Sequence, residues 1–131
     1  MRLKAGYGVK NAVIGFSWSF SIVASLKKVD YVIFTFYFIK LFINSAIFDL
    51  KDKDVDEIET LPKILSETSF RLLLTVLNLT AHTTLFVSVG FCIVVPSSFV
   101  LTQIAIFSSE KTARRLIDLE PTLSAILYRL L

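Results

Sequence analysis

The most constraining feature of the chain is a run of 38 residues, 72–109, that contains no Asp, Glu, Lys or Arg. As one helix this run would measure roughly 57 Å at about 1.5 Å per residue, nearly twice the roughly 30 Å hydrocarbon core of a bilayer. We therefore expect two helices that fold back on each other. Gly90, near the midpoint, is the expected place of the reversal. A break at Pro96 would leave too short a second half, so we expect Pro96 to kink the second helix.

The composition indicates an integral membrane protein. Hydrophobic residues make up 54% of the chain and charged residues 19%, with a mean hydropathy of +0.69. A soluble domain usually has more charged and less apolar content. We expect one all-α transmembrane domain over residues 1–131, a multi-spanning helical bundle with about four spans plus a short C-terminal helix. The expected helices are 11–27, 30–53, 66–88 and 90–109, with a shorter helix after 113 whose last part, 121–131, is a partial span or an interfacial helix.

The positive charges predict the orientation of these spans in a cell membrane. With the N-terminus inside, ten Lys and Arg residues fall on the inner side and three on the outer side. Because Lys and Arg favour the cytoplasmic side, residues 49–59 should face the cytoplasm. This topology also accounts for the net charge of +3, so we expect the bilayer and no nucleic acid as a partner.

Residues 49–59, here called the acidic segment, hold six of the eleven acidic residues of the chain. Asp49, Asp52 and Asp56 are spaced by three and four, which places them on one face if the preceding helix continues through them. Carboxylates in this arrangement could coordinate Mg²⁺ that bridges to a diphosphate. On spacing alone, however, a solvated helix end is the more frequent explanation of such a pattern, and interfacial anchoring is the corresponding explanation of Lys51, Lys53 and Lys63.

Two stretches carry a resemblance to a known family. Residues Asn44–Asp52 (NSAIFDLKD), with Asp56 and the Thr-Leu-Pro of Thr60–Pro62, resemble the second aspartate-rich motif of the UbiA superfamily of intramembrane prenyltransferases. Upstream, Lys10–Val13 with Trp18 resembles the start of the fifth helix in that family. Together these stretches cover residues 10 to 65, and the rest of the chain agrees only in hydropathy.

The resemblance implies an all-α bundle that binds a prenyl diphosphate through Mg²⁺ and transfers the prenyl group to an aromatic or other lipophilic acceptor. By matching position, Asp49, Asp52 and Asp56 would hold the metal. The residues that would bind or support the diphosphate are Asn44 and, less firmly tied to the motif, Lys51, Lys53 and Lys63.

The chain also departs from the family pattern. It has no counterpart of the first aspartate-rich motif, the segment between Asp56 and Thr60 is shorter than usual, and Val55 stands where glycine is common. We therefore expect a fragment or split half of a prenyltransferase that is inactive alone and has a possible partner chain carrying the N-terminal half. The alternative is a small non-enzymatic multi-pass membrane protein whose acidic segment binds a cation or a protein partner.

Several polar residues fall inside the expected spans. Lys40 requires a partner or a cavity there, because an ammonium group is costly in hydrocarbon. For His82 and Asn78, and likewise for Thr80, Thr83 and Thr84, we expect hydrogen bonds between helices. Cys92 is the only cysteine, and we interpret it as a small buried apolar side chain.

Overall fold

The computed structural model describes residues 8–25, 30–51, 60–90 and 92–130, and at positions 51, 89, 110 and 124–130 it describes the backbone alone. Within these ranges the chain is all-α and contains no strand. The helices are α1 (Val9–Ser25), α2 (Tyr31–Lys51), α3 (Leu61–Ile64), α4 (Glu67–Val89), α5 (Val94–Phe107) and α6 (Glu110–Leu130). The first four of the expected helices and the reversal at Gly90 are therefore confirmed. Most of the helix boundaries agree with the expected ones to within a few residues.

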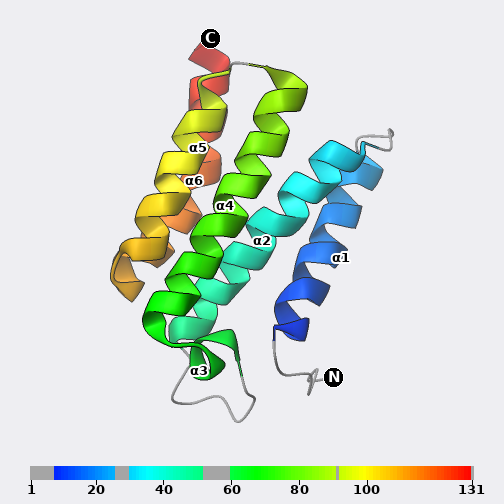
Figure 1. Cartoon of the computed structure of the whole chain (residues 1–131). Helices are drawn as coiled ribbons and strands as arrows, with labels where there is room; N and C mark the ends of the chain where they lie inside the picture. The colour runs from blue at the N-terminus through cyan, green and yellow to red at the C-terminus, as the bar shows by residue number, and fades with distance from the viewer. Residues whose placement is uncertain (1–7, 26–29, 52–59, 91, 131) are drawn as a thin grey trace.

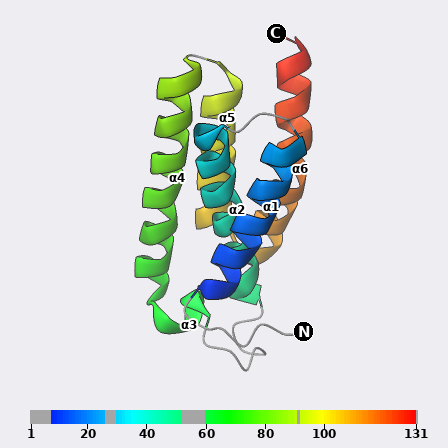
Figure 2. The same ribbon diagram turned by 90° about the vertical axis from the view of Figure 1, so that its right-hand side faces the viewer.

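The long helices run alternately in opposite directions, and all lie roughly along one axis (Figures 1 and 2). One end of the bundle holds the start of α1, the end of α2, the short α3 and the start of α4 (Figure 1). We call this the motif end, because Lys10, Asp49 and Thr60 lie there. The end of α5 and the start of α6 also lie at the motif end, as the expected topology requires.

Local sequence explains where several helices begin and end. The Asp30 carboxylate accepts hydrogen bonds from the backbone N–H groups of Val32 and Ile33, at 3.0 and 3.1 Å, and so caps α2. The Ser66 hydroxyl caps α4 by accepting from the N–H of Ser69 at 3.2 Å. Gly90 ends α4 with φ +79° and ψ −166°, a conformation that is essentially confined to glycine.

Pro96 does not kink a helix, contrary to the prediction. α5 begins at Val94, so Pro96 is the third residue of its first turn. The N–H groups of a first turn have no partner within the helix, and proline is tolerated there because it lacks that group. The chain therefore reverses between Gly90, which ends α4, and Val94, and α5 runs without a break from Val94 to Phe107.

The last helix also differs from the expectation. α6 is not a short helix after 113, since it begins at Glu110 and continues through Pro121 to Leu130. An interior proline costs one backbone hydrogen bond and crowds the preceding turn. In compensation, α6 buries Ala113 completely and packs Leu116 and Ile117 against the core formed with α2, α4 and α5.

Two helices, α2 over Tyr31–Leu50 and α4 over Glu67–Ser88, are long and apolar enough to cross a membrane. α5 is apolar but has 14 residues, which reach only about 21 Å at about 1.5 Å per residue. α1 has 17 residues. The all-α class thus holds, and a membrane location has weak support from α2 and α4, while four complete spans remain a prediction.

α1 packs against α2 along a stripe of small or short side chains spaced four residues apart, namely Asn11, Gly15, Ser19 and Val23. A Cβ atom on Gly15 would lie 2.8 Å from the backbone oxygen of Phe38, so only glycine permits this approach. The Ser19 hydroxyl donates to the Gly15 carbonyl at 2.6 Å, so this buried hydroxyl is paired within α1. This close packing fixes the position of Lys10 and Asn11 at the motif end.

Candidate functional site

At the motif end, Asp49 occupies the last turn of α2 and is 2% exposed. Its Oδ1 atom lies 2.7 Å from Nζ of Lys10 on α1. A carboxylate can be buried in its charged form only when it is paired, and Lys10 supplies that pairing. Asp49 is therefore held in place by a contact between helices.

Most of the predicted metal and diphosphate residues cannot be located relative to Asp49. Asp52, Asp56 and Lys53 lie outside the described residues, as does the side chain of Lys51, the last residue of α2. Within the described part of the chain, no group of three His, Cys, Asp or Glu side chains could hold a metal ion. The three-aspartate metal site therefore stays a prediction.

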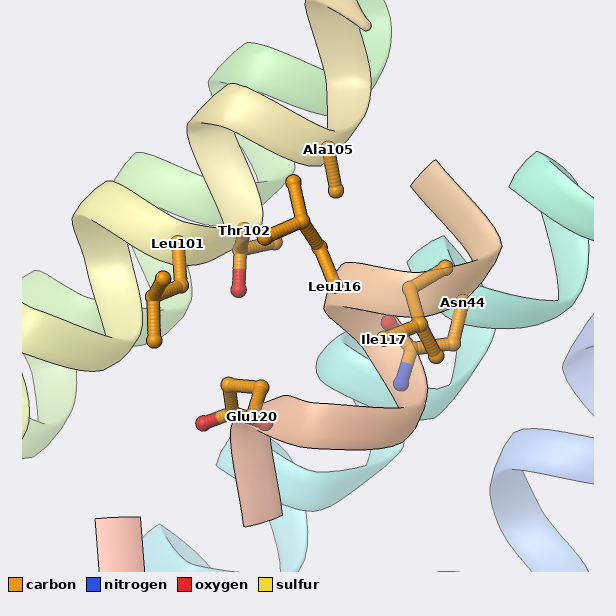
Figure 3. Close-up of a pocket in the computed structure, with 7 residues that line it drawn as sticks. All are labelled: Asn44, Leu101, Thr102, Ala105, Leu116, Ile117 and Glu120. Atoms are coloured by element: carbon orange, nitrogen blue, oxygen red, sulfur yellow. The ribbon is translucent and has the colours of Figure 1, made fainter. Parts of the chain in front are cut away.

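Asn44 and Lys63, the other two predicted residues, lie in different surroundings. Asp49 follows Asn44 by five positions, so at about 100° per residue the two side chains leave α2 about 140° apart. Asn44 points toward α5 and α6, where it lines a small gap together with Glu120 (Figure 3). Lys63 is exposed on α3 at the motif end. The structure thus does not bring Asn44 beside Asp49.

Two buried polar atoms at the motif end have no hydrogen-bond partner within the described residues. They are Nδ2 of Asn11 and the hydroxyl oxygen of Thr60. The Asn11 side chain is fixed because its Oδ1 accepts from the Ser45 hydroxyl at 2.7 Å. Thr60 is 4% exposed and directly precedes Leu61, whose side chain lies against Gly8 at the start of α1. Unpaired buried polar atoms are uncommon, and both of these groups can donate a hydrogen bond.

Sequence reasoning missed Lys10 as a member of this site. It lies 39 residues from Asp49, and no local spacing relates the two. The available signal was topological, since Lys10 starts the first helix and Asp49 ends the second, and an antiparallel pair brings those ends together. Lys10 adds a cation, and Asn11 and Thr60 add two donors, at the place where the resemblance implies an anionic substrate.

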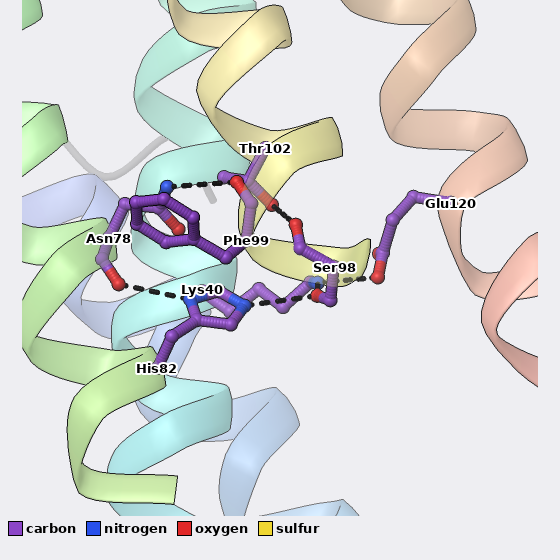
Figure 4. A network of polar contacts seen from close by, with 7 residues as sticks. All are labelled: Lys40, Asn78, His82, Ser98, Phe99, Thr102 and Glu120. Carbon is purple, nitrogen blue, oxygen red and sulfur yellow. Dashed lines mark hydrogen bonds and ion pairs between the residues drawn. The ribbon is translucent and has the colours of Figure 1, made fainter. Parts of the chain in front are cut away.

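A second polar cluster lies deeper in the bundle and crosses four helices (Figure 4). Nζ of Lys40 on α2 lies 2.7 Å from Oε1 of Glu120 on α6 and donates to the Ser98 hydroxyl on α5 at 2.5 Å. Nε2 of His82 on α4 lies 3.1 Å from the same Ser98 hydroxyl, and Nδ1 lies 2.9 Å from the Asn78 carbonyl oxygen. Lys40 thus has the partner that its position demanded.

The expected hydrogen bonds between helices are confirmed in part. His82 reaches Ser98 on α5, and Nδ2 of Asn78 donates to Oε1 of Gln103 on α5 at 3.0 Å. Thr80 and Thr84 were predicted wrongly, since each hydroxyl donates to a carbonyl oxygen of its own helix, four residues earlier. In a helix this local bond is always within reach, whereas an exposed threonine has no neighbouring helix to bond. Cys92 is free and half-buried.

The Lys40 cluster borders a cavity of about 440 Å³. Its polar lining consists of Lys40, Asn44, Ser98 and Glu120, and its walls are mainly apolar, with Phe36, Tyr37, Leu41, Leu85, Val94 and Val95 among them. A much smaller gap of about 10 Å³, shown in Figure 3, adjoins it at Asn44 and Glu120 between α2, α5 and α6. The larger cavity has the size of a small-molecule pocket, which is typically about 300–1,000 Å³.

The chain matches no protein-family model, no curated protein and no solved structure. The resemblance to UbiA-type prenyltransferases therefore stays a prediction from the two sequence stretches alone, Asn44–Pro62 and Lys10–Val13 with Trp18.

Proposed function

We propose that this chain supplies the second acidic motif of an intramembrane prenyltransferase of the UbiA type. In this proposal the motif end binds the diphosphate of a prenyl diphosphate together with Mg²⁺, and the prenyl group passes to a lipophilic or aromatic acceptor. The first acidic motif would come from another chain or segment, because residues 1–131 contain no counterpart of it.

The observation that carries the proposal is the set of groups around Asp49. Lys10 provides a positive charge 2.7 Å from that carboxylate, and Asn11 and Thr60 each hold a buried polar atom without a partner among the described residues. An ammonium, an amide N–H and a hydroxyl all donate hydrogen bonds to anionic oxygens. A diphosphate would satisfy them, whereas a purely structural site would leave two buried groups unpaired at a cost.

Each residue has a distinct part in this scheme. Asp49, with Asp52 and Asp56, would hold Mg²⁺, which when bound neutralises the charge that develops on the departing diphosphate. Lys10 keeps the Asp49 carboxylate fixed and adds positive charge beside the phosphate oxygens. Asn11 and Thr60 would orient the diphosphate by direct hydrogen bonds, which ties α1 and α3 to the same substrate.

Binding of a labelled geranyl diphosphate to the purified chain in lipid nanodiscs, with Mg²⁺ and with excess EDTA, tests the proposal. Asp49→Ala, Asp52→Ala and Asp56→Ala should each abolish the Mg²⁺-dependent component, since each removes an oxygen ligand from a cation that demands near-octahedral geometry. Asp54→Ala, Glu57→Ala and Glu59→Ala are the matched controls and should cost much less. The absence of any Mg²⁺-dependent binding would reject the proposal.

One observation favours the non-enzymatic alternative. Because Lys10 already balances Asp49, that carboxylate needs no metal ion, and the remaining acids could serve a cation or a protein partner through their summed charge. Binding by such a segment depends on its total charge and not on particular carboxylate groups. Equal, small losses from all six substitutions would therefore support the alternative.

A further inference from the structure

The 440 Å³ cavity has a different lining from the candidate site around Asp49. It is bounded by the middle and far parts of the helices, where Ile22 of α1, Leu85 of α4 and Val94 of α5 line it. Asp49, the residue of the acidic segment whose carboxylate the structure describes, is not among its lining residues. A function of this cavity can therefore be tested separately from diphosphate binding at the motif end.

The polar groups of the cavity are few and lie on α2, α5 and α6. Lys40 and Glu120 approach from α2 and α6, with Ser98 between them on α5 (Figure 4). The Lys40 and Glu120 side chains are about nine-tenths buried, at 10% and 9% exposure. The remaining walls are mainly aliphatic and aromatic. A pocket with this distribution selects a molecule with an apolar body and one polar group.

The orientation of Lys40 is fixed by its neighbours. Its ammonium donates to Glu120 and Ser98 and lies 5.7 Å from the centre of the Phe36 ring. Ser98 is fixed in turn by His82, which is enclosed between Phe36 and Phe99 in edge-to-face contacts. An ammonium has three hydrogens to donate, and the described residues provide oxygen acceptors for two of them. The third is available to an oxygen atom in the cavity.

The ion pair also determines the charge of the molecule that fits. Glu120 already neutralises Lys40, and the lining residues that the structure describes include no second cation, so an anionic head would be placed beside the Glu120 carboxylate. In surroundings of low polarity this repulsion is strong. A neutral oxygen accepts the hydrogen bond without that cost.

We infer that the cavity is a binding site for a neutral lipophilic molecule with one hydrogen-bonding oxygen, such as a phenol or a ketone carrying an alkyl chain, whose oxygen accepts from Lys40. The apolar body lies against Phe36, Leu41 and Leu85. Asn44, at the α6 side of the cavity, is within the same lining and adds a second polar group to the head region.

Photolabelling of the full chain in nanodiscs tests this inference. The probe is an alkylphenol that carries a diazirine on its chain, and labelled peptides are identified by mass spectrometry. Label should appear on α2 and α5 residues of the cavity. An unlabelled 4-hexylphenol should compete at least about tenfold better than 4-hexylbenzoate or hexylbenzene. The carboxylate of the benzoate is repelled by Glu120, and hexylbenzene has no oxygen that accepts a hydrogen bond. A monoacylglycerol and a hexyl phenyl ketone, added as separate competitors, distinguish a membrane glyceride from an aromatic lipophile as the natural source of the oxygen.

Three variants make the test specific. Val94→Trp should fill part of the cavity and reduce cavity labelling about tenfold or more, while Val100→Trp, on the exposed side of the same helix, should leave it unchanged. Glu120→Gln removes the repulsion, so 4-hexylbenzoate should then compete better than 4-hexylphenol. Equal competition by hexylbenzene, label placed outside the cavity, or unchanged labelling in Val94→Trp would each overturn the inference.

Discussion

The Nζ atom of Lys40 lies 2.7 Å from Oε1 of Glu120, and this pair joins the second helix of the chain to the last one in the interior of the bundle. Both partners are deeply buried, so neither can be replaced without consequence for the other. Burying an ion pair costs desolvation free energy. Its main effect is therefore to determine which faces of the two helices pack together.

Removing one member of this pair should destabilise the fold strongly. Glu120→Leu leaves an unpaired buried ammonium, and we expect a loss of about 3–5 kcal/mol in the free energy of unfolding. The double variant Lys40→Met/Glu120→Leu, which buries no charge, should recover most of this loss. Unfolding curves in mixed micelles measure both effects. Glu67→Gln, which breaks the exposed pair with Arg71, is the control and should change stability by less than about 0.5 kcal/mol. A double variant as unstable as the single one would contradict this account.

Gly15→Ala should weaken the contact between α1 and α2. In an unpacked helix this change gains about 1 kcal/mol, but here the new methyl group meets the Phe38 carbonyl at 2.8 Å and forces the helices apart. We expect a net loss of about 1–3 kcal/mol. Ser21→Ala, on the exposed side of the same helix, is the control and should be neutral or stabilising. A stabilised Gly15→Ala protein would show that the close approach does not exist.

Gly90→Ala isolates backbone strain from packing. Nothing lies within 4 Å of a Cβ atom at this position, so any loss comes from the conformation at φ +79°, which we expect to cost about 1–3 kcal/mol. Thermal unfolding, with Val87→Ala as an exposed control near the same helix end, measures the difference. No loss at position 90 would mean that the turn after α4 adopts another backbone conformation.

Membrane topology can be determined with single cysteines in a Cys92→Ala background. If the long helices all cross the bilayer, Ser66→Cys and Ser109→Cys should react with an impermeant maleimide from one side, and Cys92 in the natural chain should react from the other. Labelling of positions 66 and 109 from opposite sides would show that α5, which has only 14 residues, does not span the membrane.

Transfer activity should require more than this chain. Because only one of the two acidic motifs of the family pattern is present, we expect residues 1–131 to transfer no prenyl group alone, and a partner that supplies the first motif to restore transfer. Incubation in membranes with Mg²⁺, prenyl diphosphates and candidate acceptors measures the product. Robust turnover by the purified chain would refute the requirement for two motifs.

The helices of this chain could be predicted well from the sequence, and the contacts between them could not. The uncharged run 72–109 and the span lengths predict where α4 and α5 lie, and Gly90 marks the reversal because few other residues tolerate its backbone angles. The mid-span position of Lys40 predicts that it needs a partner. That the partner is Glu120 depends on how α6 packs against α2, and no local pattern in the sequence specifies that contact.

The residues of the candidate site likewise fall into two groups: those that the local sequence pattern identifies and those that only the packing of helices brings in. Asp49 and Thr60 stand out through the local pattern of the acidic segment. Lys10 and Asn11 join them only because the small side chains of α1 let that helix lie close to α2, and this is a property of packing between distant segments. The family resemblance associated Asn44 with Asp49, although their side chains leave α2 in different directions.

Along this chain each long helix packs against the next long helix, α1 with α2, α2 with α4, α4 with α5 and α5 with α6, and α2 also packs against the more distant α6. Neighbouring helices can pair as soon as both have left the ribosome, since little chain has to be ordered to bring them together. The α1–α2 hairpin can therefore form first and stay paired while the later helices are synthesised. The final step of assembly is the docking of those helices onto α2. Slow or arrested synthesis after α2 would leave a paired hairpin with an uncovered face, which gives the cell's quality control a defined species to recognise.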